Sequence, residues 1–395
     1  MRESVTHKHR LPETFQPMSQ AEIFDVAVIG AGIAGASLAY RLAGQRSVVL
    51  LERESQPGYH STGRSAAMFM ESYGPSTVRA LTRASRKFFT QPPDGFTEQP
   101  LLGARGAMYL ASPDQQALLE RQYSELLLSC PDLERLDRDQ TLARVACLRP
   151  DRVYGSLLDR GAMDIDVHAL HQGFLRAMRR NGGVLKTLAE VQSAQRRNKL
   201  WELGLGDGTR LLAHTVVNAA GAWADRIGNL FGAQPIGLVP HRRTAFTFKQ
   251  PEGMQVADWP MVATVAEDFY FKPDAGVLLG SPANADATEP HDVVPEELDV
   301  ATGIHHIEAA TTLTIRRPLR TWSGLRSFVP DGEMVIGWDA QCDNFLWLAG
   351  QGGYGIQSAP AASELAASLV IGLPLPDRLT WHGVKQNLLS PARLR

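Results

Sequence analysis

The chain has 395 residues, of which 44% are hydrophobic and 21% are charged, and its formal net charge is −2. This composition excludes collagen-like, low-complexity and wholly disordered proteins, and the length suffices for two domains without disulfide bonds. The absence of a basic surplus argues against nucleic-acid binding, because contact with a phosphate backbone requires an excess of Lys and Arg.

The cysteines and the N-terminal residues set further expectations. Cys130, Cys147 and Cys342 form no CxxC pair, so neither a structural metal site nor a disulfide framework is expected. This usage fits a reducing, cytoplasmic compartment. No apolar run reaches the roughly 20 residues of a membrane helix. Residues 1–20 are polar and lack the apolar core of a signal peptide, so we expect a disordered leader, with Met18 as an alternative start.

A strand, a glycine-rich turn, a helix and a second strand follow one another after this leader. The strands, 24–29 and 47–51, are nearly continuous apolar runs, which is typical of parallel strands buried on both faces. The glycine-rich turn GAGIAG occupies 30–35, a helix is predicted over 36–43, and Glu52 follows the second strand. GxGxxG alone is a weak signal, but in this context it indicates a dinucleotide-binding fingerprint.

The chemistry of such a fingerprint assigns a physical role to four residues. Gly30 permits the tight turn, Gly32 lets a pyrophosphate approach the backbone, and Gly35 allows close packing of helix on strand. The helix N-terminus offers free N–H groups to the phosphates. Glu52 is expected to accept hydrogen bonds from the adenosine ribose hydroxyls.

The later segments predict an α/β protein in which a second domain interrupts the nucleotide-binding elements. Further nucleotide-domain elements are predicted as helices at 169–180 and 358–370 and strands at 184–188, 201–205, 212–217 and 345–348. Strands of the second domain are predicted at 242–248, 260–265, 268–272 and 276–280. The nucleotide-binding domain is expected to comprise 22–74, 166–224 and 321–395, and the substrate domain 75–165 and 225–320.

Four motifs resemble the glycine-oxidase/D-amino-acid-oxidase family of FAD enzymes. They are VIGAGIAGAS (28–37), LERESQPGYHSTGRSAA (51–67), VVNAAGAWAD (216–225) and AGQGGYGIQSAPA (349–361). Within that family the chain is most similar to bacterial D-arginine dehydrogenase, through RRTAFTF (242–248), FYFKPDAGVLLGSPANAD (269–286), ATTLTIRRP (310–318) and LRSFVPDGEMV (325–335). The resemblance covers nearly everything from Phe24 to the C-terminus. It implies a Rossmann-type FAD-binding domain interleaved with a substrate domain built on a large mixed sheet.

The resemblance also implies which residues contact FAD. The STGRS-type loop runs beside the flavin in the family, and the glycines before helix 358–370 bring a helix N-terminus to the flavin ring, where it stabilises negative charge. No cysteine flanks Arg326, so the FAD is expected to be non-covalent. The predicted cofactor contacts are Gly30, Gly32, Ile33, Ala34, Gly35, Glu52, Arg53, Ser61, Thr62, Arg64, Ser65, Ala66, Val191, Ala220, Gly221, Trp223, Arg326, Gly352, Gly353, Tyr354, Gly355, Ile356 and Gln357.

The predicted catalytic residues bind an amino acid. A carboxylate near an apolar flavin face needs a charged partner, and the planar fork of arginine binds it with two hydrogen bonds. By the resemblance, Arg243 and Arg326 bind this carboxylate, and Tyr270 contacts the substrate. Tyr73 closes over it as a lid, and the carbonyl of Gly353 accepts a hydrogen bond from its amine.

The implied reaction is hydride transfer from Cα to flavin N5, which gives an imino acid that water hydrolyses to a 2-oxo acid and ammonia. Two departures from D-arginine dehydrogenase concern the substrate side chain. Ala107 stands where that enzyme has a glutamate, and Met68, with Met70 close by, replaces a histidine. We therefore expect a neutral or hydrophobic D-amino acid as substrate. Two alternatives stay open: the alignment with D-arginine dehydrogenase is shifted by one residue, or Glu71 replaces the missing glutamate.

Other functions on the same fold stay open. They are a secondary-amine oxidase of the sarcosine/glycine type, a 2-hydroxy-acid dehydrogenase and a non-catalytic flavoprotein subunit. Retention of both Arg243 and Arg326 disfavours the last, because a scaffold has no need of an arginine pair. The motifs do not identify the electron acceptor.

Overall fold

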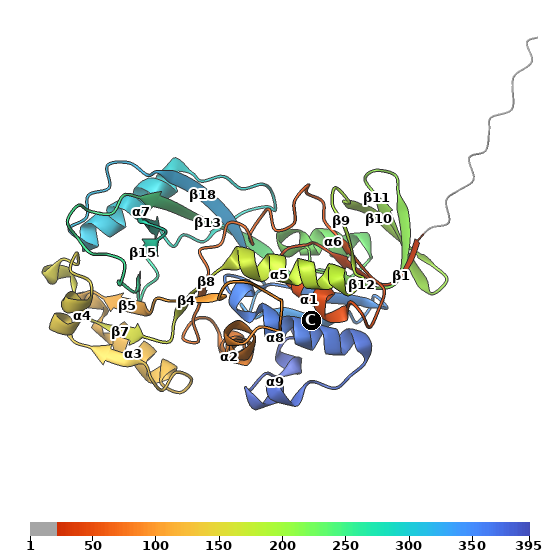
Figure 1. Cartoon of the computed structure of the whole chain (residues 1–395), viewed down its shortest axis with the longest axis horizontal. Helices are drawn as coiled ribbons and strands as arrows, with labels where there is room; N and C mark the ends of the chain where they lie inside the picture. The colour runs from red at the N-terminus through yellow and green to blue at the C-terminus, as the bar shows by residue number, and fades with distance from the viewer. Residues whose placement is uncertain (1–21) are drawn as a thin grey trace, which may run out of the picture.

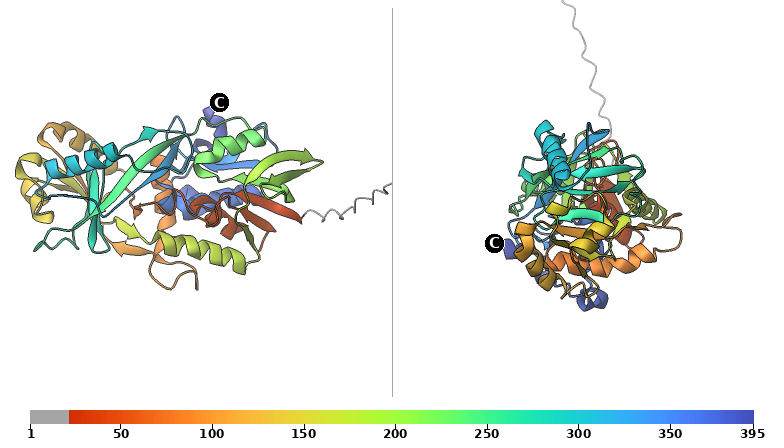
Figure 2. Two further views of the ribbon diagram at one scale, coloured as in Figure 1. Left: turned by 90° about the horizontal axis from the view of Figure 1, so that it is seen from above. Right: turned by 90° about the vertical axis from the view of Figure 1, so that its left-hand side faces the viewer.

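The computed structural model describes residues 22–395, so the predicted leader lies outside the described residues. Two large sheets lie side by side along the long axis of the molecule (Figures 1 and 2). The N-terminal strands (red) and the C-terminal helix α8 (blue) share one half. None of the helices within 22–395 is long and apolar enough to cross a lipid bilayer.

The first sheet has five parallel strands at its centre, in the order β20–β12–β1–β2–β9. β19 pairs antiparallel with β20, and the hairpin β10–β11 extends the first half of β12. The bounds are β1 (Glu22–Ile29), β2 (Val48–Leu51), β9 (Val184–Lys186), β10 (Val191–Arg197), β11 (Leu200–Leu205), β12 (Arg210–Asn218), β19 (Val335–Trp338) and β20 (Phe345–Ala349).

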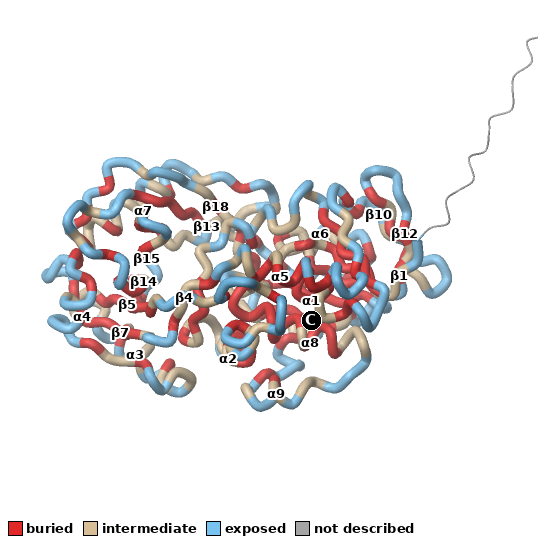
Figure 3. Tube along the Cα trace, viewed as in Figure 1, coloured by how far each residue is buried: buried red, intermediate tan, exposed pale blue. Residues whose placement is uncertain are grey.

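Both faces of this sheet are covered, because its strands carry apolar side chains on both sides. Val26 and Val28 of β1 join a core with the helices, whereas Ala27 and Ile29 join a second core on the opposite face. The helices on the first face are α1 (Ile33–Leu42), α2 (Ser76–Thr90), α5 (Val167–Arg180) and α8 (Gly355–Ile371), with α9 (Asp377–Trp381) beside α2. The second face holds α6 (Ala224–Leu230). Figure 3 shows α1 and the centre of this sheet as largely buried.

The second sheet has nine strands, in the order β17–β13–β16–β15–β14–β5–β7–β6, with β18 also paired to β13. Its strands are β5 (Ala107–Ala111), β6 (Glu134–Leu136), β7 (Gly155–Asp159), β13 (Val239–Phe248), β14 (Met261–Thr264), β15 (Tyr270–Asp274), β16 (Val277–Ser281), β17 (Asp286–Ala287) and β18 (Arg320–Phe328). The helices at this end are α3 (Gln116–Leu126), α4 (Arg138–Arg144) and α7 (Glu297–Ala310). A small sheet of β3 (Met68–Phe69), β8 (Met163–Ile165) and β4 (Leu102–Ala104) completes the fold.

This architecture confirms the predicted fold class, an α/β nucleotide-binding sheet interleaved with a large mixed sheet. Two elements cross the ranges predicted for the two domains, however. α2, in the range 75–165, packs against α8 in the core of the first sheet. β18, in the range 321–395, pairs along its whole length with β13 of the second sheet. The predicted residue ranges of the two domains therefore stay a prediction. Their boundaries depend on pairing between segments that are distant in the sequence.

Candidate active site

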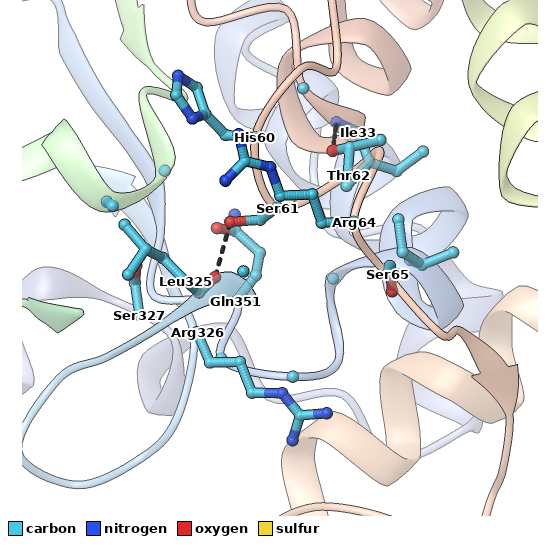
Figure 4. A pocket seen from close by; sticks show the side chains of 18 of the residues that line it. Ile33, His60, Ser61, Thr62, Arg64, Ser65, Leu325, Arg326, Ser327 and Gln351 are labelled. Carbon is cyan, nitrogen blue, oxygen red and sulfur yellow. Dashed lines mark hydrogen bonds between the residues drawn. The ribbon is translucent and has the colours of Figure 1, made fainter. Parts of the chain in front are cut away.

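A cavity of about 520 Å³ is lined by residues of both large sheets. The first sheet contributes the turn between β1 and α1, the loop 58–67 and the loop 219–223. The second contributes β13, β14 and β15, and the end of β18 meets the loop 351–357 there. Figure 4 shows loop 60–65 above this space, with Arg326 below it.

The glycine turn leaves no room for side chains at two positions. Gly30 has φ +99°, and a Cβ built there would stand 2.5 Å from the carbonyl oxygen of Ala219. A Cβ on Gly35 would stand 1.9 Å from the carbonyl oxygen of Gly30, because α1 packs directly on the turn. Gly32 is different, since it lines the cavity and its nearest neighbour would be the Thr62 hydroxyl at 3.3 Å. A side chain at Gly32 would thus enter the cavity.

The carboxylate of Glu52 is held against this turn. Its Oε2 accepts a hydrogen bond from the backbone N–H of Ala31 (3.0 Å), and its Oε1 accepts one from the backbone N–H of Glu54 (3.0 Å). Burial raises the pKa of this carboxyl, although both backbone hydrogen bonds oppose the shift. Each oxygen keeps lone pairs for a further donor on the cavity side.

Loop 58–67 is anchored on both sides of the cavity. The hydroxyl of Thr62 accepts a hydrogen bond from the N–H of Ile33 (3.0 Å), and the hydroxyl of Ser61 donates to the carbonyl of Leu325 (2.6 Å), as Figure 4 shows. Because α1 begins at Ile33, Thr62 satisfies one of its free N–H groups.

The guanidinium of Arg64 binds protein groups. It donates to the carbonyls of Val293 (2.9 Å) and Ser323 (3.2 Å) and pairs with the carboxylate of Asp292. The side chain of Arg64 therefore fixes the loop to the second sheet. This role as an anchor was not predicted from the sequence, since all three partners lie more than 200 residues away in the chain.

A buried amide donor in the cavity wall, on Gln357, has no partner in the described protein. The side-chain oxygen of Gln357 accepts from the N–H of Met70 (3.1 Å), but its Nε2 is buried and unpaired. A buried donor without an acceptor costs about 1–3 kcal/mol. The carbonyl and ring-nitrogen acceptors of a flavin would satisfy it, so the cavity wall fits the cofactor that the motifs imply.

Two arginines project from neighbouring strands into the other part of the cavity. Arg243 of β13 lies diagonally across from Arg326 of β18, whose direct neighbour is His241. Within residues 22–395, neither guanidinium has a carboxylate partner within 4.0 Å, and the Nε of Arg243 is buried without any hydrogen bond. Burial and the charge of Arg326 both lower the pKa of Arg243. Two neighbouring, partly buried cations without a directly paired carboxylate favour an anionic ligand.

Arg242, the neighbour of Arg243, differs from it because its guanidinium is paired with carboxylates. It points to the opposite face of β13 and forms ion pairs with Asp299 (2.8 Å), Glu296 and Asp286 (3.5 Å). Its role is therefore structural.

The remaining predicted catalytic residues surround the arginine pair. The Nη1 of Arg326 donates to the hydroxyl of Tyr73 (3.1 Å), and Tyr270 of β15 lines the same cavity. Gly353 lies directly against Arg326, since a Cβ there would stand 2.9 Å from its Nη1. These residues, far apart in the sequence, are brought together as the resemblance implies.

Three predicted site residues do not line the cavity. Gly35 is covered by the turn it packs on, and the ring of Tyr354 packs against Tyr73 (5.0 Å between centroids) and Phe328 (6.3 Å). Ala107 is fully buried in an apolar cluster with Met68 and Met70. The place of Ala107 in the substrate side-chain pocket stays a prediction, since Ala107 packs with both methionines but does not itself reach the cavity surface.

The other predicted cofactor residues all lie in the cavity wall, together with Met68 and Met70. The alternative acid, Glu71, is bound by Arg86 at 2.7 Å and is absent from the wall. Sequence reasoning missed His60, Tyr109, Met261 and Glu267, which do line it. Of these four, only Tyr109 could have been predicted from the sequence. It follows the predicted pocket residue Ala107 by two positions, and alternate residues of a strand point to the same face.

Comparison with known proteins identifies relatives along most of the chain. The family model described as "FAD dependent oxidoreductase", DAO, matches residues 25–369. Dimethylglycine dehydrogenase of Rattus norvegicus is 24% identical over 370 residues, which cover 88% of this chain and 43% of the relative. The chain thus spans less than half the length of that relative. Glycine oxidase of Bacillus licheniformis is 24% identical, covering 89% of this chain and 94% of the relative.

Solved structures share the fold. A glycine oxidase from Geobacillus kaustophilus has a TM-score of 0.77 at 21% identity, covering 89% of this chain and 96% of its own. An L-proline dehydrogenase from P. horikoshii has a TM-score of 0.78 at 20% identity, covering 95% and 98%. At such identities the likeness shows the fold alone.

Proposed function

The chain belongs to the DAO family of FAD-dependent oxidoreductases, and on that basis we propose that it oxidatively deaminates a D-amino acid. The observation that carries the proposal is the pair of partly buried guanidiniums, Arg243 and Arg326, neither of which has a carboxylate within 4.0 Å in the described protein. A substrate carboxylate supplies that charge and matches the planar fork of each arginine. We propose that FAD is held non-covalently, by the cavity wall described above.

When bound, the oxidised flavin supplies a two-electron acceptor for hydride. The protein residues bind and orient the substrate so that its Cα–H faces that acceptor. Arg243 and Arg326 fix the carboxylate, while Tyr270, Tyr73 and the carbonyl of Gly353 hold the rest of the amino acid. Loss of hydride leaves an imino acid, which water hydrolyses to a 2-oxo acid and ammonia. With the carboxylate held by the arginines, the amine by the carbonyl of Gly353 and the side chain by its pocket, only one enantiomer presents its Cα–H to the flavin, and we propose that it is the D-isomer, as the resemblance implies.

The wall around the substrate side chain favours neutral or hydrophobic groups. Met68, Met70 and Met261 all line the cavity, and thioether side chains adapt to apolar groups of varied shape. Glu267, at the exposed loop between β14 and β15, is a carboxylate near the arginine pair that the sequence had not revealed. The similarity to D-arginine dehydrogenase stays a prediction.

A panel of amino acids tests this function. We expect anaerobic bleaching of the flavin by D-Met, D-Leu or D-Phe, with slower bleaching by D-Arg and D-Lys and none by L-isomers. The apolar preference amounts to about 0.8 kcal/mol per buried CH₂ group. Fastest bleaching by D-Arg would contradict the apolar preference and would point to an acidic group in the wall, such as Glu267.

A second candidate is oxidation of a secondary amine such as sarcosine, or of glycine. It is favoured by the similarity to dimethylglycine dehydrogenase and glycine oxidase. The same arginine pair would bind these carboxylates. Bleaching by sarcosine or glycine, with inert D-Met, would support this candidate and reject the first. A 2-hydroxy acid in the panel tests the remaining alternative.

The burial of Ala107 predicts the outcome of one substitution. Ala107→Glu places a carboxylate in an apolar cluster, so we expect it to lower the free energy of unfolding by about 3–5 kcal/mol, seen as a lower Tm. Ala104→Glu, on the exposed end of β4, is the matched control and should leave Tm unchanged. An unchanged Tm together with new activity on D-Arg would support the predicted place of Ala107 in the substrate pocket.

A further inference from the structure

A row of side chains crosses the second sheet beside the arginine pair. Tyr109 of β5 is in register with Ala263 of β14, which is in register with Tyr270 of β15. Residues in register on neighbouring strands point to the same face, and strands lie about 4.8 Å apart. Tyr109 and Tyr270 therefore flank the small side chain of Ala263, and all three line the cavity. Tyr109 thus lies on the same sheet face as the predicted substrate contact Tyr270, two strands away from it.

The hydroxyl of Tyr109 begins a chain of hydrogen bonds that leaves the cavity. It lies 2.9 Å from the hydroxyl of Ser72, and the Ser72 hydroxyl donates to Oδ2 of Asp159 at 2.6 Å. Tyr109 and Ser72 are only 9% and 5% exposed, whereas Asp159, at the end of β7, is partly exposed. The chain thus connects the buried cavity wall to a carboxylate that solvent can reach.

The donor directions in this chain are fixed by chemistry. A carboxylate accepts only, so the one hydrogen of Ser72 points to Asp159. The hydrogen between Ser72 and Tyr109 must then come from Tyr109. The oxygen of Tyr109 is left with free lone pairs, which accept hydrogen bonds from a group in the cavity.

The charge on Asp159 is not neutralised by an ion pair within the described residues. Its Oδ1 accepts only from the N–H of Gly161 (2.9 Å), and burial raises the pKa of this carboxyl. A carboxylate with a raised pKa is a better proton acceptor. Burial also raises the pKa of Tyr109, so its hydroxyl keeps its proton and passes protons on without forming a stable phenolate.

We propose that Tyr109, Ser72 and Asp159 form a proton relay that deprotonates the substrate ammonium before hydride transfer. This rests on the proposed function, which needs a neutral amine whose lone pair replaces the electrons leaving with the Cα hydride. One N–H bond of the ammonium breaks and its proton goes to Tyr109. The proton of Tyr109 passes to Ser72, and that of Ser72 to Oδ2 of Asp159, which releases it to water.

The first test follows flavin reduction against pH in the anaerobic holoprotein, with the best D-amino acid of the panel. Tyr109→Phe should slow reduction roughly 100-fold near neutral pH, because general-base assistance contributes that order of rate. The deficit should vanish at a pH above the pKa of the free amine. Ser72→Ala and Asp159→Asn should behave alike, and Ser72→Thr, which keeps the hydroxyl, should restore the rate.

Other titratable groups lie near the relay, and they are unchanged between the wild type and the relay variants. Tyr73 and Cys130 lie near Tyr109, while Glu71 and Arg86 lie near Asp159. The matched control is Tyr123→Phe, which removes a hydroxyl from the same apolar cluster outside the cavity wall and should leave the pH profile unchanged.

The second test measures binding alone. 2-Aminoisobutyrate has a carboxylate and an ammonium but no Cα hydrogen, so it binds without reducing the flavin. Titration calorimetry of 2-aminoisobutyrate binding, in two buffers that differ in ionisation enthalpy, measures the protons released. We expect proton release on binding to the wild type and none with Tyr109→Phe. Equal proton release and equal pH profiles in both proteins would overturn the relay while leaving the proposed function intact. A wild-type flavin that no D-amino acid reduces would instead overturn the proposed function, and the relay with it.

Discussion

Replacing Arg326 by Met should lower kcat/KM for an amino-acid substrate by about 2–5 kcal/mol, or roughly 30- to 5000-fold. The reason is that Met leaves the substrate carboxylate facing Arg243 alone, in a partly buried cavity. Arg326→Lys should also be poor, because an ammonium cannot form the bidentate fork. Steady-state kinetics on the preferred substrate gives the measurement.

Arg320→Met is the matched control for this experiment. Arg320 lies on the same strand, β18, but is exposed, so its loss should leave kcat/KM unchanged. Flavin absorbance checks that each variant retains FAD, and Tm checks folding. Wild-type efficiency in Arg326→Met would remove this residue from the carboxylate site and with it the main support for the proposed function.

The second large effect is expected at the glycine turn, where Gly32→Val should yield apoprotein. Gly32 has φ −72° and ψ −172°, which valine adopts without strain, so the fold should persist. The new side chain enters the cavity beside Thr62 and displaces the pyrophosphate from the N-terminus of α1. Each charge-assisted hydrogen bond lost costs about 1.5–3 kcal/mol, or roughly 10- to 150-fold in the Kd of FAD.

Titration of the apoprotein with FAD, followed by flavin fluorescence, measures this loss. Gly103→Val is the control, because a Cβ added to Gly103 on β4 would come no closer than 4.0 Å to any neighbouring atom. It should bind FAD like the wild type. Full FAD binding by Gly32→Val would place the pyrophosphate elsewhere.

Local sequence patterns were sufficient to predict the nucleotide-binding sheet. The order strand, glycine turn, helix and strand depends on contacts within some 30 residues, so the fingerprint from β1 to Glu52 is legible in the chain itself. The close approach at Gly35 and the positive φ of Gly30 are the physical reasons that only glycine fits there. Helices α2 and α7 were not predicted, although α2 has apolar residues at helical spacing.

The substrate side of the site depends on packing between distant segments. The resemblance implied Arg243 and Arg326 as carboxylate ligands. Only the register of β13 with β18 shows that both lie on the same face of the second sheet, and only the folded structure shows that neither is paired with a carboxylate within 4.0 Å. The burial of Ala107 and the ion pair of Glu71 with Arg86 likewise follow from contacts that no motif contains.

The contrast between the two parts of the site has one physical cause. Residues whose role follows from local backbone geometry, such as Gly30 and Gly35, could be identified from the chain alone. The partners of Arg64 and the hydrogen bonds from Tyr109 through Ser72 to Asp159 became visible only in the folded molecule. A side chain's hydrogen-bond partner is set by which strands and loops become neighbours in space, and no local spacing in the chain encodes that.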